Sequence, residues 1–115
     1  MIKIREKGLQ DYVKTWEEMK SFTENRNSDT PDELWTLEHS SVFTQGLSGK
    51  PEHLLKATQI PIIQSVRGGQ ITFHAPCQLI IYCLIDIKRL CIGIKKMVTI
   101  IEQSLIELLS SYGIT

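Results

Sequence analysis

The pattern of apolar and polar positions predicts a chain of strands with two helices. Apolar and charged residues alternate from Ile2 to Lys7, which is typical of a half-buried strand, and Gly8 is expected to end it. From Leu9 to about Arg26 the apolar residues recur every three or four positions, as in an amphipathic helix. The same spacing returns after Gly93 and predicts a second helix that stops at Gly113.

The segments between the two helices are rich in β-branched and aromatic residues and are bounded by turn residues. We predict strands at Leu34–His39, Val42–Thr44, Pro61–Val66, Gln70–Phe73 and Leu79–Ile87. The last segment is an unbroken apolar run, so it is expected to be buried on both faces. Strands followed by a long helix predict an α+β (mixed α/β) layer fold, with one domain over residues 1–115.

Composition and charge narrow the possible functions. The 115 residues are 42% hydrophobic and 23% charged, as in a globular protein. Lys+Arg and Asp+Glu both number 13, so no basic surface for nucleic acid is expected. Asp86, Lys88 and Arg89 interrupt the longest apolar run before it can span a membrane, and no signal peptide is visible. The expected location is therefore the cytoplasm.

The three cysteines, Cys77, Cys83 and Cys91, do not indicate a disulfide framework or a metal site. Their number is odd, no secretion signal accompanies them, and their spacing matches no common zinc pattern. We expect no metal and no cofactor. Cys83 and Cys91 are interpreted as small buried apolar residues.

Arg67 is the only formally charged residue between Ala57 and Ile85. Burying an unpaired guanidinium is costly, so it must reach solvent or find anionic or carbonyl partners. The following Gly68-Gly69 pair lets backbone approach another group closely. With Thr72 and His74 on one face of the next strand, these residues form a candidate ligand pocket.

Simpler interpretations of the same residues stay open. Arg67 can extend to solvent at a strand end, and Gly68-Gly69 can be a plain hairpin turn. His74 can be a hydrogen-bonded core histidine.

The segment Arg67-Gly68-Gly69-Gln70-Ile71-Thr72-Phe73-His74 resembles the signature of the lipoyl(octanoyl)transferases, Arg-Gly-Gly-x-x-Thr-Tyr/Phe-His-Gly-Pro-Gly-Gln-Leu. Other segments resemble the family in the same order. They are Asp32–Trp35 with Glu38-His39, Val42–Gly46, Gly49–His53 and Leu84–Arg89.

The resemblance implies part of the fold of biotin and lipoate protein ligases, a mixed sheet packed with helices. It also implies octanoyl transfer from octanoyl-acyl carrier protein, through a thioester on a cysteine, to a lysine of a lipoyl domain. Such domains belong to 2-oxoacid dehydrogenases and to the glycine cleavage H protein. The substrate-binding residues implied are Arg67, Gly68, Gly69, Gln70, Ile71, Thr72, Phe73 and His74.

Three departures from the family pattern bear on activity. The family's nucleophilic cysteine and its partner lysine lie beyond the stretch that ends here, so no catalytic residue is expected within it. Ala75-Pro76-Cys77 replaces Gly-Pro-Gly, which adds about 1 kcal/mol or more of strain if a replaced glycine has positive φ. Val66 replaces the usual aspartate. Cys77 is a poor substitute nucleophile, because no lysine lies between Lys56 and Lys88.

Other functions remain as alternatives. One alternative is a catalytically inactive truncated relic or a binding-only fragment. An ATP-dependent lipoate or biotin ligase is disfavoured, because Gly46 to Lys50 lacks the spacing of a phosphate-binding loop. The basic residues Lys88, Arg89, Lys95 and Lys96 either dock an acidic carrier protein or form a solvated face.

Unpaired strand edges predict marginal folding of the isolated chain.

Overall fold

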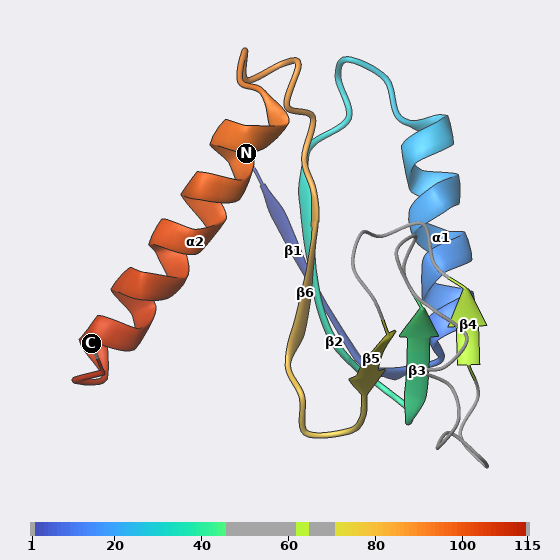
Figure 1. The fold of residues 1–115 in the computed structure, drawn as a ribbon. Coiled ribbons are helices and arrows are strands. Elements are labelled where there is room, and N and C mark those ends of the chain that lie inside the picture. The colour runs from blue at the N-terminus through green and yellow to red at the C-terminus, as the bar shows by residue number, and fades with distance from the viewer. Residues whose placement is uncertain (1, 46–61, 65–70, 115) are drawn as a thin grey trace. The chain divides into compact units, whose positions relative to one another are not determined.

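The computed structural model describes residues 2–45, 62–64 and 71–114 and divides the chain into two units, Met1–Leu84 and Ile85–Thr115. It confirms the predicted α+β class. The elements in chain order are β1 (Lys3–Gln10), α1 (Tyr12–Asn25), β2 (Glu33–His39), β3 (Val42–Gln45), β4 (Ile62–Gln64), β5 (Ile71–His74), β6 (Ile80–Leu84) and α2 (Ile94–Ser111) (Figure 1).

In the first sheet, β2 lies between β1, which is parallel to it, and β6, which is antiparallel (Figure 1). The expectation that Gly8 ends the first strand was wrong, because β1 continues to Gln10. The register shifts between Glu6 and Gly8, and Gly8 has φ +70°. The extra residue is thus absorbed as a β-bulge, for which glycine supplies the left-handed backbone.

The bulge places Lys7 on the side of the sheet that α1 covers. Its ammonium lies 4.1 Å from the centre of the Trp35 ring and 2.7 Å from a carboxylate oxygen of Glu18 on α1. A bulge commonly redirects a side chain in this way. Here it gives the helix a charged contact with β1.

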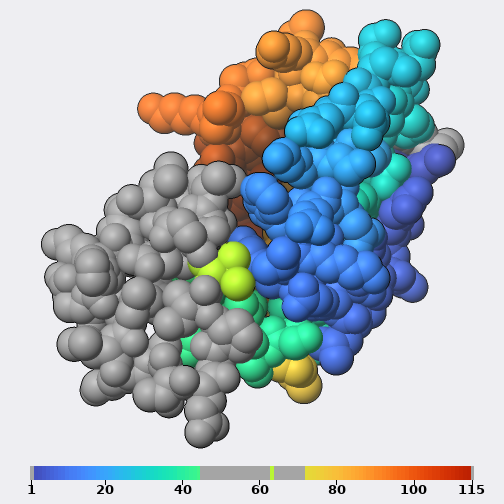
Figure 2. Space-filling view, turned by 90° about the vertical axis from the view of Figure 1, so that its right-hand side faces the viewer, coloured from blue at the N-terminus to red at the C-terminus, as the bar shows by residue number. Residues whose placement is uncertain are grey.

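Helix α1 covers one face of this sheet, and it is the blue helix that faces the viewer in Figure 2. Alternate residues of β2 are buried, and Trp35 and Leu37 are only 3% and 2% exposed. The helix begins at Tyr12, later than predicted, because the Asp11 carboxylate accepts the Lys14 N–H at 3.1 Å. Such an N-cap satisfies one of the free amide groups at the helix start.

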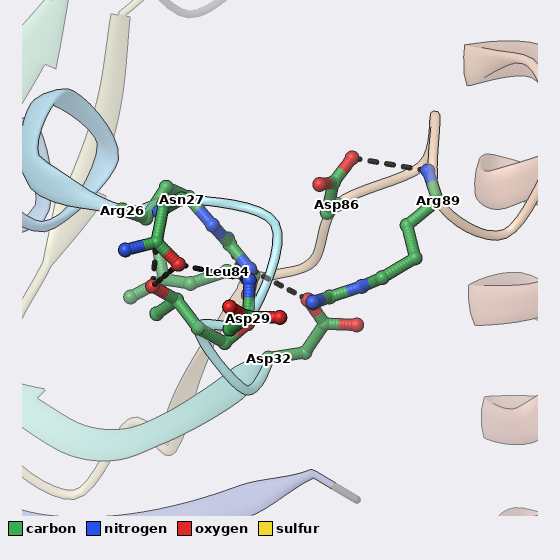
Figure 3. A network of polar contacts seen from close by, with 8 residues as sticks. Arg26, Asn27, Asp29, Asp32, Leu84, Asp86 and Arg89 are labelled. Carbon is green, nitrogen blue, oxygen red and sulfur yellow. Dashed lines mark hydrogen bonds and ion pairs between the residues drawn. The ribbon is translucent and has the colours of Figure 1, made fainter.

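Arg26, directly after α1, ties three parts of the first unit together (Figure 3). Its guanidinium lies 2.7 Å from the Asp32 carboxylate before β2 and donates to the Leu84 carbonyl at the end of β6 at 3.2 Å. The Arg26 and Asp32 side chains are only 14% and 9% exposed. A pair this well covered is stabilising only if its remaining hydrogen bonds are satisfied. The Leu84 carbonyl accepts one of them, whereas the buried Nε of Arg26 has no hydrogen-bond partner in the described part of the chain.

Strand β6 differs from the prediction in length and in burial. It spans Ile80–Leu84, and residues alternate between half-buried and exposed, with Ile81 47% exposed. The expectation of a strand buried on both faces was therefore wrong. An unbroken apolar run conceals the period of two that would have shown a one-sided strand.

In the second sheet, β3 lies between β4, which is parallel, and β5, which is antiparallel. Thr44 pairs with Thr72, and Val42 pairs with His74. Val42 and Thr44 are buried. This register places His74, at the end of β5, beside the first residue of β3, a few residues after the end of β2. Of the predicted strand Pro61–Val66, only Ile62–Gln64 lies in the described part.

The second unit contains α2. Gly113 follows it with φ +79°, and the Ile114 and Gly113 amides donate to the carbonyls of Leu109 and Ser110 at 3.0 and 2.9 Å. This is a Schellman motif, so the predicted stop at Gly113 is confirmed. Among the residues with described structure, no helix is long and apolar enough to cross a membrane.

Candidate functional site

Half of the predicted substrate-binding segment is described, and it forms β5. Arg67, Gly68, Gly69 and Gln70 lie outside the described residues, as does the Ile71 side chain. Thr72 and Phe73 are exposed, whereas His74 is half-buried. Among the described side chains of this segment, that of His74 is therefore the most buried.

His74 has a different environment on each edge of its ring. Its Nε2 lies 3.3 Å from the Thr44 hydroxyl oxygen, and Thr44 is completely buried. Its Nδ1 lies 3.0 Å from the side-chain oxygen of the exposed Gln78. Because an amide oxygen accepts, Nδ1 carries the proton in this arrangement and Nε2 accepts from the Thr44 hydroxyl. The donor edge of His74 therefore faces the surface.

His39, at the end of β2, is completely buried and lies beside His74. Its Nδ1 lies 2.9 Å from the Gln10 carbonyl oxygen, and its Nε2 lies 2.8 Å from the Tyr82 hydroxyl. A carbonyl oxygen can only accept, so Nδ1 carries the proton and Nε2 accepts from Tyr82. His39 is thus held as one neutral tautomer.

Burial determines the protonation states of His39 and Tyr82. Burial lowers the pKa of His39, although the hydrogen bond to Gln10 opposes the shift. Burial, with a smaller contribution from Tyr12, raises the pKa of Tyr82 to about 12. Tyr82 therefore keeps its hydroxyl proton and remains a donor to His39.

Four rings from α1, β2, β5 and β6 meet at this point. The Tyr12 ring centre lies 5.2 Å from that of His39 and 6.3 Å from that of His74, to which it is nearly parallel at 7°. The ring centres of His39 and His74 are also 6.3 Å apart, at 66°. The His74 ring is therefore bordered by two aromatic rings in addition to its hydrogen-bond partners.

Tyr12 also lines a cavity of about 180 Å³ between α1 and β4. The lining is mainly apolar and consists of Tyr12, Val13, Trp16, Glu17 and Ile63. In Figure 2, β4 is the yellow-green segment beside the blue helix. One aromatic side chain thus connects an apolar cavity with the ring cluster around His74.

Sequence reasoning did not select Tyr12, His39, Thr44 or Tyr82 as site residues. One signal for His39 was available. It occupies the buried phase of the alternation in β2, together with Trp35 and Leu37. A histidine in that phase needs hydrogen-bond partners from neighbouring strands, because burying a polar group without them is costly.

The turn after β5 contains the predicted backbone strain. Cys77 has φ +74°, a conformation that favours glycine, and no positive φ occurs at Ala75. The Cys77 N–H donates to the Glu38 carboxylate. This hydrogen bond is made by the backbone and satisfies the Cys77 amide in the turn.

The other cysteines differ from their prediction. Cys83 and Cys91 are exposed, so their interpretation as buried residues was wrong. Cys91 also has a left-handed φ of +58°, which places it in a turn. Within residues 2–45, 62–64 and 71–114, no three or more His, Cys, Asp or Glu side chains are grouped to hold a metal.

Comparison with known proteins defines the class. The model of the lipoyl protein ligase A/B catalytic domain matches residues 11–115, so the chain belongs to this family. Its similar relatives include the octanoyltransferases of Vesicomyosocius okutanii, 57% identical over 93% of this chain, and of Haemophilus influenzae, 53% identical over 96%. These matches cover 52% and 53% of the two relatives, so the chain spans about half the length of the curated relatives it matches.

Replacing Cys77 by glycine is expected to stabilise the chain by about 1 kcal/mol, because a Cβ in the left-handed region costs that much. Urea unfolding of C77G and the parent chain measures the difference. The matched control is C77A, which keeps the Cβ and should unfold like the parent. Equal stabilisation by alanine and glycine would show that the thiol, not the backbone, carries the strain.

The buried neutral His39 makes stability depend on pH. The unfolded chain binds a proton near the ordinary pKa of 6.5, whereas the folded chain binds it only at lower pH. The contribution is complete above pH 6.5 and is lost as pH falls toward the lowered pKa, at no more than about 1.4 kcal/mol per pH unit. Urea unfolding from neutral pH to about pH 5.5 measures it. The H39Q chain should show a flatter dependence, and an unchanged slope would contradict this origin.

Proposed function

We propose that the chain is the N-terminal part of an octanoyltransferase of protein lipoylation. In the proposed reaction, a cysteine thiol attacks the thioester of octanoyl-acyl carrier protein and releases the carrier thiol. A lysine amine of a lipoyl domain then attacks the enzyme thioester, so that an amide forms and the cysteine thiol is regenerated. The more than 50% identity to octanoyltransferases over nearly the whole chain supports this proposal.

The proposed role of this chain is to bind the octanoyl group. The segment from Arg67 to His74 would supply the substrate-binding residues, as the resemblance of its sequence implies. His74 carries the proposal structurally, since its donor edge lies at the surface and its other edge is anchored on buried Thr44. The nearby apolar cavity at Tyr12 is suited in character to an alkyl chain.

The chemical step is assigned to residues outside the stretch matched here. None of Cys77, Cys83 and Cys91 is proposed as the nucleophile, because none lies in a matching motif and no lysine lies between Lys56 and Lys88 to accompany Cys77. We therefore expect binding of the octanoyl group, but no octanoyl transfer, from residues 1–115 alone.

The partners follow from the same proposal. They are octanoyl-acyl carrier protein and the lipoyl domains of 2-oxoacid dehydrogenases and of the glycine cleavage H protein, and the reaction would occur in the cytoplasm. Lys88, Lys95 and Lys96 are exposed and offer positive charge to an acidic carrier protein. The sheet, the two helices and the family match also fit a ligase, but the relatives named octanoyltransferase favour transfer without ATP.

Replacing His74 by alanine is expected to weaken binding of octanoyl-acyl carrier protein to the 115-residue chain about tenfold, the loss expected for one hydrogen bond of about 1.4 kcal/mol. Calorimetry with octanoyl-loaded and unloaded carrier protein separates recognition of the acyl group from recognition of the carrier. Y112F is the control, because Tyr112 is 76% exposed and is not among the proposed substrate-binding residues.

Equal affinity for loaded and unloaded carrier protein would contradict the proposed role in acyl binding. Detectable octanoyl transfer to a lipoyl domain would contradict the assignment of the nucleophile to another part of the protein. Release of pyrophosphate from ATP in the presence of octanoate would favour the ligase alternative.

A further inference from the structure

The cavity beside α1 has a lining that suits an alkyl chain better than water. Tyr12, Val13, Trp16 and Glu17 come from adjacent turns of the helix, and Ile63 comes from β4, the yellow-green segment in Figure 2. A buried water needs about two to four polar partners, and a mainly apolar lining offers few. An apolar guest therefore fits this cavity better than solvent does.

The cavity is large enough for a short alkyl chain. Its volume is about 180 Å³, and an apolar protein cavity of about 150 Å³ can hold a benzene molecule. The cavity therefore has room for roughly six carbons, which is most of an octanoyl chain. Each methylene group that leaves water for such a cavity raises affinity about fourfold.

Tyr12 relates this cavity to His74 of the proposed substrate-binding segment. The Tyr12 ring lines the cavity and lies nearly parallel to the His74 ring, with the two ring centres 6.3 Å apart. The carbonyl end of an acyl chain at His74 is thus separated from the cavity by a single aromatic side chain.

The acidic side chain of Glu17 decides which end of a chain the cavity favours. Glu17 borders the cavity and is exposed at the surface. An anionic head group is disfavoured beside it, because like charges repel each other at short range. The neighbouring lining residues Val13, Trp16 and Ile63 are apolar, so the methyl end of a chain is the end that enters.

We propose that this cavity takes the methyl end of an acyl chain and limits its length, with Val13 and Trp16 as specificity-determining residues. The identification of this chain as the octanoyl group of acyl carrier protein rests on the proposed function. Binding of a free fatty acid in the cavity does not, so the two can fail separately.

Calorimetry with hexanoate, octanoate, decanoate and dodecanoate tests the length limit on the 115-residue chain. Affinity should rise about fourfold for each methylene group up to octanoate and change little beyond it, because roughly six carbons fit the cavity and the head-group end stays outside. A continued rise through dodecanoate, or no binding of any of these acids, would overturn the inference.

The variant V13F should shorten the preferred chain, because the larger side chain fills part of the cavity. Val13 is 38% exposed, so the replacement leaves the core intact. Octanoate should bind about fifteenfold more weakly, as for two excluded methylene groups, whereas hexanoate should change little. V98F is the matched control, since it makes the same replacement at a valine of α2 that is 47% exposed. An equal effect of V13F on both acids, or no effect, would overturn the role of Val13.

Octanoate brominated at its terminal carbon or at its second carbon tests the orientation, because bromine quenches tryptophan fluorescence on contact. Trp16 lines the cavity, whereas Trp35 is 3% exposed and does not line it. The terminal bromine should quench more strongly in the parent chain, and W16F should abolish the difference. Equal quenching by the two acids in the parent would overturn the orientation without any substitution.

Octanoyl-loaded and unloaded carrier protein separate this inference from the proposed function. If the fatty acids bind as expected but the loaded carrier protein binds no better than the unloaded one, the cavity is supported and the proposed function fails. If the loaded carrier protein is preferred equally by the parent and by V13F, the inference is overturned and the proposed function stands.

Discussion

The buried hydrogen bonds of His39 are the interaction on which the described site depends. They connect β2 to the Gln10 carbonyl of β1 and to the Tyr82 hydroxyl of β6, and the ring itself contacts Tyr12 of α1. Loss of either partner would leave a buried polar atom unsatisfied, which costs about 1–3 kcal/mol. Because His74 borders the same ring, the stability of the first sheet and the geometry of the candidate site share one set of contacts.

Other polar contacts surround this cluster and hold its frame. Arg26 joins the end of α1 to Asp32 and Leu84, while Lys7 joins the bulge in β1 to Glu18 and Trp35. Few hydrophobic residues of the described part are buried, namely Tyr12, Trp35, Leu37 and Val42. The orientation of α1 on the sheet therefore depends on directional polar contacts as well as on apolar burial, which alone is not directional.

The sequence predicts the elements well where the period of the apolar residues is distinct. The three-to-four spacing identified both helices, and alternation of apolar and charged residues identified β1. Prediction was wrong at Gly8 and at β6. A bulge depends on the partner strand, and the exposed face of β6 depends on what covers the sheet, so neither can be determined locally.

The sequence predicted only part of the candidate site. The signature indicated β5 and His74, and the Gly-Pro-Gly comparison anticipated the left-handed backbone at Cys77. The roles of Tyr12, His39 and Tyr82 were not predicted, because these residues meet only through pairing of strands distant in sequence. The family match explains why the signature was informative, and the tertiary contacts show what supports it.

The most direct test is to locate the bound octanoyl group on the isotope-labelled 115-residue polypeptide. Filtered NMR experiments would detect contacts between unlabelled octanoyl-acyl carrier protein and the labelled residues. We expect contacts from the octanoyl methylene groups to Thr72, Phe73 and His74 of β5. Contacts confined instead to the hollow lined by Glu6, Thr36 and Leu79, among others, would contradict it.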